Sequence, residues 1–238
     1  MKIRGFLLLQ LGLLCLSMGQ SKPKLYVFVP SNVRPNNMER FISDSCTQLQ
    51  IQVFGRHREL RKGVEVAPPD AILAPDPVLT SGLYEGYRAA LVGSRANATE
   101  EKYVLLSVGQ KVEIREIPEL AIGAVDLLGR RDMMTFITGV LGQKPRKFEP
   151  VTKHEELLTI LQFQDVDAIF VPEQLVDSYY KERSKMDLIR TEVPTRIGLP
   201  RLSTSATDPE KLKLLKACLN GLSAGLNGKL GVEHWVSP

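Results

Sequence analysis

Apolar and polar residues follow one another along the first half of the chain with two different periods. Short apolar runs rich in β-branched and aromatic residues predict buried strands at residues 24–30, 51–54 and 70–74. Between the first two runs, apolar residues recur at helical spacing over residues 38–49, and Asn36 or Asn37 can cap this helix. This order of strand, helix and strand indicates an α/β fold with a mostly parallel sheet.

The same layout begins again in the second half of the chain. Further extended segments are predicted at residues 103–108, 112–117, 120–125, 148–151, 167–171 and 188–193. Helices are predicted at residues 133–141, 154–162 and 210–222, the last one starting with Asp208 and Pro209. The final helix is not needed to complete either α/β half. We therefore expect the chain to return and this helix to cover the first half. The prediction is therefore a first lobe at 22–108 plus 200–238 and a second lobe at 109–199.

The first residues have the pattern of a secretory signal peptide. Lys2 and Arg4 precede an uncharged, leucine-rich run that is too short to remain as a membrane-spanning helix. We expect cleavage after Gly19, which makes residues 1–19 the leader, with cleavage after Ser21 as the alternative. The mature protein is therefore expected to be exported, with the periplasm as its location.

Composition excludes several classes of function. Part of the formal net charge of +4 lies in the leader, and the remaining acids and bases are interspersed. Aromatic residues make up only 6% of the chain, so neither charge nor stacking residues indicate a nucleic-acid partner. The histidines lie far apart and no cysteine pair has ligand spacing, so we predict no metal and no cofactor. Known nucleophile, phosphate-loop and zinc-protease motifs are absent from the sequence, which favours a protein that is not an enzyme.

Cysteine usage leaves one question open. Cys15 lies in the leader, and the residues before it are not the small ones that a lipid-anchoring site needs. Cys46 and Cys218 remain after cleavage. In an oxidising compartment they can pair, and a loop of this length would stabilise the fold by up to about 4–5 kcal/mol. The alternative is two separate buried thiols that pack as small apolar residues.

Three segments of the chain resemble type 2 periplasmic solute-binding proteins, and more loosely their phosphate- and phosphonate-binding branch. They are residues 118–129 (PELAIGAVDLLG), 165–172 (DVDAIFVP) and 230–235 (LGVEHW). The resemblance implies two α/β lobes joined by two crossing segments, which close on a solute by hinge motion. It also implies that a monomer captures a small anionic or zwitterionic solute and delivers it to the permease of an ABC transporter. The alternative is a ligand-sensing module for a membrane signalling protein.

Polar turns at the predicted strand ends supply the candidate ligand-binding residues, because open α/β sheets bind ligands outside the carboxyl ends of their strands. The candidates are Ser31, Asn32, Asp76, Thr80, Arg130, Arg131, Asp132 and Glu173. Either of the two adjacent arginines could hold an anion through bidentate hydrogen bonds, and the other is expected to face solvent. Each remaining candidate has an alternative role in which it ends a strand or caps a helix. Phosphonate binders often carry a Ser/Thr run where this chain has Arg130-Arg131-Asp132, so phosphonate itself is not favoured.

Overall fold

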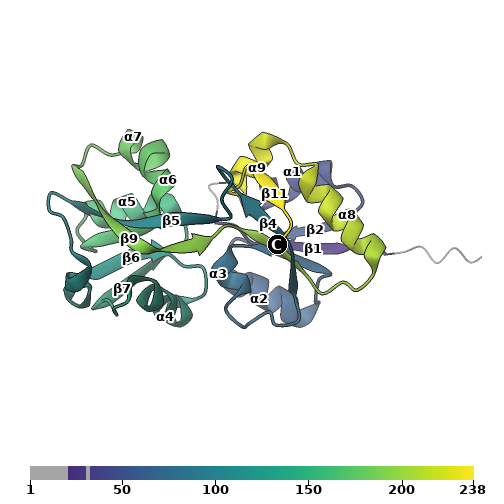
Figure 1. Ribbon diagram of the computed structural model, residues 1–238, viewed down its shortest axis with the longest axis horizontal. Coiled ribbons are helices and arrows are strands. Elements are labelled where there is room, and N and C mark those ends of the chain that lie inside the picture. Colours follow the sequence, from purple (N-terminus) through teal and green to yellow (C-terminus); the bar gives the residue numbers. More distant parts are fainter. Residues whose placement is uncertain (1–20, 31–32) are drawn as a thin grey trace, which may run out of the picture.

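The computed structural model describes residues 21–30 and 33–238, and the predicted leader lies outside this range. The chain folds into two α/β lobes that lie side by side and are joined by two crossing segments (Figure 1). Each lobe has its own sheet with flanking helices, which confirms the predicted fold class. Within the described ranges, no helix combines the length and apolar character needed to cross a membrane.

The first lobe is built on a six-stranded sheet. Its strands are β1 (Lys24–Val27), β2 (Gln50–Val53), β3 (Ala71–Ala74), β4 (Arg88–Ser94), β10 (Arg201–Thr204) and β11 (His234–Val236), in the order β11-β4-β10-β3-β1-β2. Its helices are α1 (Pro35–Ser45), α2 (His57–Val66), α3 (Asp76–Leu79), α8 (Pro209–Asn220) and α9 (Ala224–Lys229). Asp208 caps α8 by accepting a hydrogen bond of 2.9 Å from the Glu210 N–H.

The second lobe is built on a five-stranded sheet. Its strands are β5 (Glu100–Val108), β6 (Ala121–Val125), β7 (Lys147–Val151), β8 (Ala168–Pro172) and β9 (Leu188–Gly198), in the order β7-β6-β8-β5-β9. Two longer helices, α4 (Arg130–Leu141) and α5 (His154–Gln162), pack on it. A composite helix follows β8 and consists of α6 (Glu173–Leu175), a π-helical segment (Val176–Tyr180) and α7 (Lys181–Arg183).

Both sheets are mixed rather than mostly parallel. Parallel pairing is confined to β1 with β2 and β3, and to β6 with β7 and β8. The strands next to the crossings pair antiparallel, because the chain leaves the first lobe through β4 and β5 and returns through β9 and β10. Residues 104–106 of β5 are all buried, so this antiparallel strand has the continuous apolar run that is typical of a parallel one.

Strand β5 belongs to the second lobe, and this corrects the expected boundary after residue 108. It pairs with β9 from Glu100 opposite Gly198 to Val108 opposite Leu188. The first crossing therefore lies between β4 and β5, at a tight turn over residues 95–98. Residues 112–117 also differ from the prediction, because a 3-10 helix (Ile114–Glu119) occupies most of this segment. The Glu116 carboxylate accepts a hydrogen bond of 2.8 Å from the Glu113 N–H and so begins this helix.

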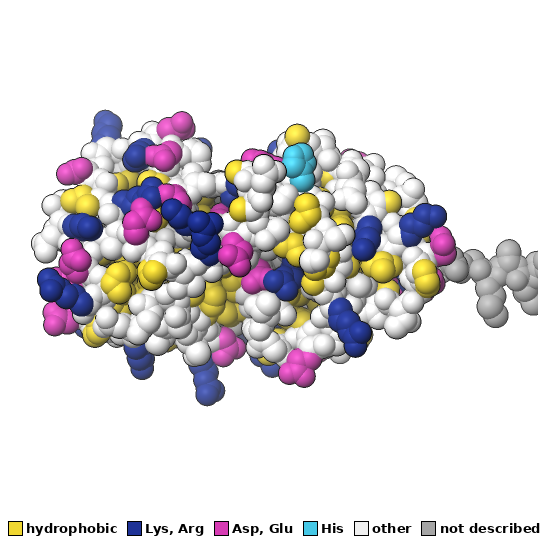
Figure 2. Space-filling view, in the orientation of Figure 1, with side chains coloured by type: hydrophobic (Ala, Val, Ile, Leu, Met, Phe, Trp, Pro, Cys, Tyr) yellow, Lys and Arg dark blue, Asp and Glu magenta, His cyan; other side chains and the backbone are white. Residues whose placement is uncertain are grey.

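Two clusters of apolar side chains stabilise the molecule. One cluster lies between the first sheet, α1 and α8, and contains Leu25 and Val27 of β1. The other contains Tyr26 and Phe28, which point to the opposite face because successive strand residues alternate. This second cluster also contains apolar side chains of the second lobe, such as Leu128, so the two lobes share one apolar cluster. On the face shown in Figure 2, acidic and basic side chains are interspersed over both lobes.

A disulfide joins the end of α1 to α8. Cys46 and Cys218 are bonded, their Cα atoms lie 5.3 Å apart, and both side chains are buried. The cross-link connects two helices on the same face of the first sheet. The two cysteines therefore form a disulfide and are not two separate buried thiols.

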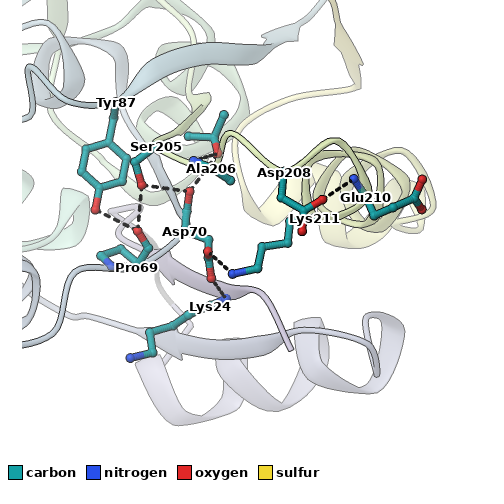
Figure 3. Close-up of polar contacts among 10 residues, drawn as sticks. Lys24, Pro69, Asp70, Tyr87, Ser205, Ala206, Asp208, Glu210 and Lys211 are labelled. Atoms are coloured by element: carbon teal, nitrogen blue, oxygen red, sulfur yellow. Dashed lines mark hydrogen bonds and ion pairs between the residues drawn. The ribbon is translucent and has the colours of Figure 1, made fainter. Parts of the chain in front are cut away.

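Asp70 links several elements of the first lobe (Figure 3). It lies at the amino ends of β1 and β3, on the opposite side of the sheet from their carboxyl ends. Its carboxylate accepts hydrogen bonds of 2.8 Å from the Lys24 N–H and from the Lys211 ammonium, and its carbonyl accepts one from the Thr204 hydroxyl. Burial opposes ionisation of Asp70, but the bonds from Lys211 and Lys24 outweigh it, so its pKa lies below the usual value. This network therefore holds β1, β10 and α8 together and stabilises the first lobe.

Candidate functional site

A cavity of about 330 Å³ lies between the lobes, where the carboxyl ends of β1, β3, β6 and β8 meet the crossing segments. The first lobe contributes Val29, Val33, Pro75 and Pro77, together with the end of α9. The second lobe contributes mainly large apolar side chains, which are Leu127, Met133, Phe136, Phe170 and Leu175. Both crossings line the cavity as well, so it is bounded by the two lobes and by the segments that join them.

Polar side chains are few in this cavity, and two of them neutralise each other. Arg95 and Glu101, on either side of the first crossing, form an ion pair of 2.8 Å. The Arg95 guanidinium also donates to the Gly231 carbonyl, which attaches the crossing to the segment after α9. Burial raises the pKa of Glu101, while the nearby positive charge of Arg95 opposes this shift.

Tyr103 and His154 supply two further hydrogen-bonding groups, and the exposed side chains of Gln174 and Lys229 supply the others. The Tyr103 ring stacks on Phe170 with 4.7 Å between ring centroids, and burial raises the pKa of its hydroxyl well above the usual value. Burial lowers the pKa of His154 to about 4, so its imidazole is neutral at pH 7. The Tyr180 hydroxyl lies 3.5 Å from His154 Nδ1 and 3.3 Å from its carbonyl oxygen, which holds the ring in place.

A second cavity of about 400 Å³ shares Val29, Pro30 and Val33 with the first. It lies at the mouth between the lobes, where α1, α2 and α5 begin. Arg34, Arg56, Glu59 and Lys153 line it, and the two arginines and the lysine are solvent-exposed. The inner cavity is thus apolar and the outer one is mainly basic.

The lobes also contact each other through a buried histidine. His57 begins α2, its Nε2 lies 3.2 Å from the Tyr84 hydroxyl, and it bonds to the backbone of Leu128 in the second lobe. Burial lowers the pKa of His57, although the negative charge of Asp126 and the bond to Leu128 partly offset this effect. The two lobes are therefore in direct contact at this histidine.

None of the described candidates from the sequence lines the inner cavity. Asp76 begins α3 between the two prolines that do, and its carboxylate forms an ion pair with Arg201. The Thr80 hydroxyl donates to the Asp76 carbonyl at 2.9 Å. Both side chains thus have structural contacts at the end of β3.

The remaining candidates belong to the second lobe or lie outside the described residues. Arg130, Arg131 and Asp132 are exposed on the first turn of α4, and Arg130 lies 4.0 Å from the Glu149 carboxylate. Glu173 forms an ion pair with Arg190. Ser31 and Asn32 fall in the gap in the described chain. A ligand-binding role for these residues stays a prediction. The described candidates do not line the cavity that contains Tyr103 and His154.

Sequence reasoning missed the polar residues that do line the cavity. Glu101 and Tyr103 lie two positions apart in β5 and both line the cavity. This spacing is only a weak signal of a site, and the sequence predicts the strand in the other lobe. His154 lies in the first turn of a helix, where a histidine has no distinctive pattern. Across the described part of the chain, no cluster of three His, Cys, Asp or Glu residues could hold a metal ion.

Comparison with known proteins defines the class of fold. No protein-family model and no curated protein sequence matches the chain. PhnD1 from Prochlorococcus marinus, solved in complex with methylphosphonate, superimposes with a TM-score of 0.64 over 92% of this chain and 93% of its own, at 11% identity. The binding-protein component of an ABC phosphonate transporter from Pseudomonas aeruginosa gives 0.61 over 91% and 82%, at 12% identity.

A sensor domain has a similar structure. The VFT2 domain of BvgS from Bordetella pertussis superimposes with a TM-score of 0.54 over 88% of this chain and 91% of that domain, at 13% identity. These neighbours are type 2 periplasmic binding proteins, so the resemblance noted in the sequence is confirmed for the fold. At such low identity the comparison concerns architecture and not ligand.

Proposed function

We propose that this protein is an exported solute-binding protein that captures a small molecule between its two lobes. The observation that carries the proposal is the cavity of about 330 Å³ between the lobes, lined by both lobes and both crossing segments. A cavity of this size lies within the range of about 300–1,000 Å³ that is typical of small-molecule sites. Because the walls belong to two bodies, the ligand favours the closed arrangement by contacting both.

Delivery to the permease of an ABC transporter is the role that we propose for the captured solute. The leader at residues 1–19 supports export to the periplasm, where the protein would act as a monomer. The fold shared with the phosphonate transporter component from Pseudomonas aeruginosa supports the same role. No part of this proposal requires the protein to be an enzyme.

A thermal-shift screen of the mature protein tests the capture of a ligand. The panel should contain phosphonates, phosphate, amino acids, organic acids and neutral aromatic compounds. A ligand at a hundredfold excess over its Kd stabilises the folded protein by about 2.7 kcal/mol, which is a measurable shift in Tm. If every compound leaves the Tm unchanged, the proposal loses its main support.

A matched pair of variants tests whether binding occurs in the cavity. Ala124 is buried and lines the cavity, so Ala124→Leu adds three carbon atoms to the space that the ligand needs. Ala217 is exposed on α8, so Ala217→Leu adds the same atoms at a distance. We expect only the first variant to abolish the ligand-induced shift. Equal binding by both variants would place the ligand elsewhere.

A sensory role is the second candidate, and the observation that favours it is the structural similarity to the BvgS VFT2 domain. In this role the ligand-bound protein would contact a membrane signalling protein instead of a permease. Deletion of the gene separates the two candidates. Loss of ligand uptake supports delivery, whereas normal uptake with loss of a ligand-dependent transcriptional response supports sensing.

A further inference from the structure

The apolar character of the inner cavity constrains what it can hold. Two valines and three prolines of the first lobe line the cavity together with phenylalanine, leucine and methionine side chains of the second. Such a surface gains free energy when it is covered by apolar atoms, whereas a strongly hydrated solute would have to lose its water without replacement. The volume is about twice that of the ~150 Å³ apolar cavity known to bind benzene, which suits a molecule of one or two rings.

The charges in the interior of the cavity offer no counter-ion to a ligand. Arg95 is already paired with Glu101 and with the Gly231 carbonyl. His154 is neutral at pH 7. Lys229 also lines the cavity, but its side chain is exposed, so its ammonium stays hydrated and is screened by solvent. A carboxylate or phosphonate buried here would be an unpaired charge, which is strongly unfavourable.

Two partly buried side chains of the cavity offer hydrogen-bonding atoms to a ligand, whereas Gln174, which also lines it, is exposed. The Tyr103 hydroxyl has no hydrogen-bond partner among the described residues, and stacking on Phe170 fixes its ring. The Nε2 atom of His154 likewise has no partner in the described part of the chain, since Tyr180 lies at Nδ1. Both residues line the cavity from the second lobe.

From these observations we infer that the ligand is an uncharged, largely apolar molecule of one or two rings, with one polar group that hydrogen-bonds to Tyr103 and His154. The inference rests on the proposed function, because it names the class of solute that the same cavity takes. It differs from the anionic or zwitterionic solute expected from the sequence. Among the described residues, the basic side chains that line these cavities without an ion-pair partner are solvent-exposed. They are Lys229 at the inner cavity and Arg34, Arg56 and Lys153 at the outer one.

Fluorescence titration of the mature protein with 1-naphthylamine tests the inference. This probe is neutral at pH 7 and has two rings and one amino group, and its emission shifts to shorter wavelength in an apolar site. We expect saturable binding that 1-naphthol displaces and that methylphosphonate and L-arginine do not displace. Ala124→Leu should abolish the signal, and Ala217→Leu should leave it unchanged.

Tyr103→Phe tests the hydrogen bond, with Tyr87→Phe as its matched control. The Tyr87 hydroxyl donates to the Pro69 carbonyl at 2.9 Å within the first lobe and does not line the cavity. We expect Tyr103→Phe to weaken 1-naphthol binding about fivefold, the effect of one neutral hydrogen bond. Naphthalene has no hydroxyl, so its binding should not change. Tyr87→Phe should affect neither compound.

The outcomes separate this inference from the proposed function. If methylphosphonate or L-arginine binds and 1-naphthol does not, the ligand class is wrong while capture of a solute stands. If no neutral or charged compound binds, both are wrong. Unchanged 1-naphthol affinity in Tyr103→Phe would overturn the assigned hydrogen bond, and binding that survives Ala124→Leu would overturn the assigned cavity.

Discussion

Removal of the disulfide is expected to destabilise the first lobe strongly. In Cys46→Ala/Cys218→Ala the fold loses a cross-link between residues that are 172 positions apart. The chain-entropy relation gives about 5 kcal/mol for a loop of this length. If the second lobe stays folded while the first unfolds, the flexible part of the loop is only about 70 residues, and the same relation still gives about 4 kcal/mol. The expected loss is therefore insensitive to how the lobes unfold.

The chain contains its own reporter for this experiment. Trp235 is the single tryptophan, and its Nε1 donates to Asn227 Oδ1 at 3.0 Å within the first lobe. Guanidinium unfolding followed by tryptophan fluorescence therefore reports on the lobe that contains the disulfide. We expect the free energy of unfolding of the variant to fall by about 4–5 kcal/mol.

Reductant provides the control for this prediction. Wild-type protein treated with dithiothreitol should unfold at the same midpoint as the double variant, and the variant should not respond to dithiothreitol. The reasoning would be refuted by a loss below about 1 kcal/mol in the variant, because the loop-entropy model cannot give so small a value. A variant that responds to reductant would show that some other thiol chemistry is being measured.

Three further predictions concern pH and packing. The pKa of His154 is about 4 in the folded protein and 6.5 in the unfolded chain. The free energy of unfolding should therefore fall by about 3 kcal/mol as the pH drops from 6.5 to 4. His154→Gln should remove this pH dependence, as measured by urea unfolding at several pH values. The pKa of Asp70 is lowered, so its contribution is present above its unfolded value of 3.8 and is lost as pH falls through the folded value. Asp70→Asn should therefore lower the Tm at pH 7 and not at pH 2, and equal losses at both would contradict the assigned ion pair. A Cβ atom at Gly198 would lie 2.5 Å from Asp76 Cγ, so Gly198→Ala should cost about 1–3 kcal/mol by overpacking, measured as a shift in the denaturation midpoint.

Much of the fold could be predicted because the signals are local. The apolar run that becomes β8 and the Asp208-Pro209 start of α8 need only the period of the pattern and the chemistry of a cap. Strand β5 shows the limit of local signals, because the sequence predicts it in the first lobe and the structure has it in the second. Its apolar residues would suit either sheet, and only the pairing of Glu100 to Val108 with β9 assigns it.

The candidate site illustrates the same limit in another way. Polar turns at strand ends were reasonable candidates, but a polar side chain at a turn can be used by the protein itself. Asp76 pairs with Arg201 and Glu173 with Arg190, partners more than 15 positions away that no spacing rule identifies. Tyr103, which lies in the interior of a strand, lines the cavity instead.

The sequence by itself determined the α/β class, the division into two lobes and most strand and helix positions, since these depend on periodicities of two and 3.6 residues. Tertiary structure alone decided which lobe receives β5, which partner each charge finds, and which side chains face the cavity. The physical reason is that a cavity between two lobes is lined from both crossings and both sheets. Its chemistry therefore depends on contacts between residues as far apart as Arg95 and Gly231, which no local pattern records.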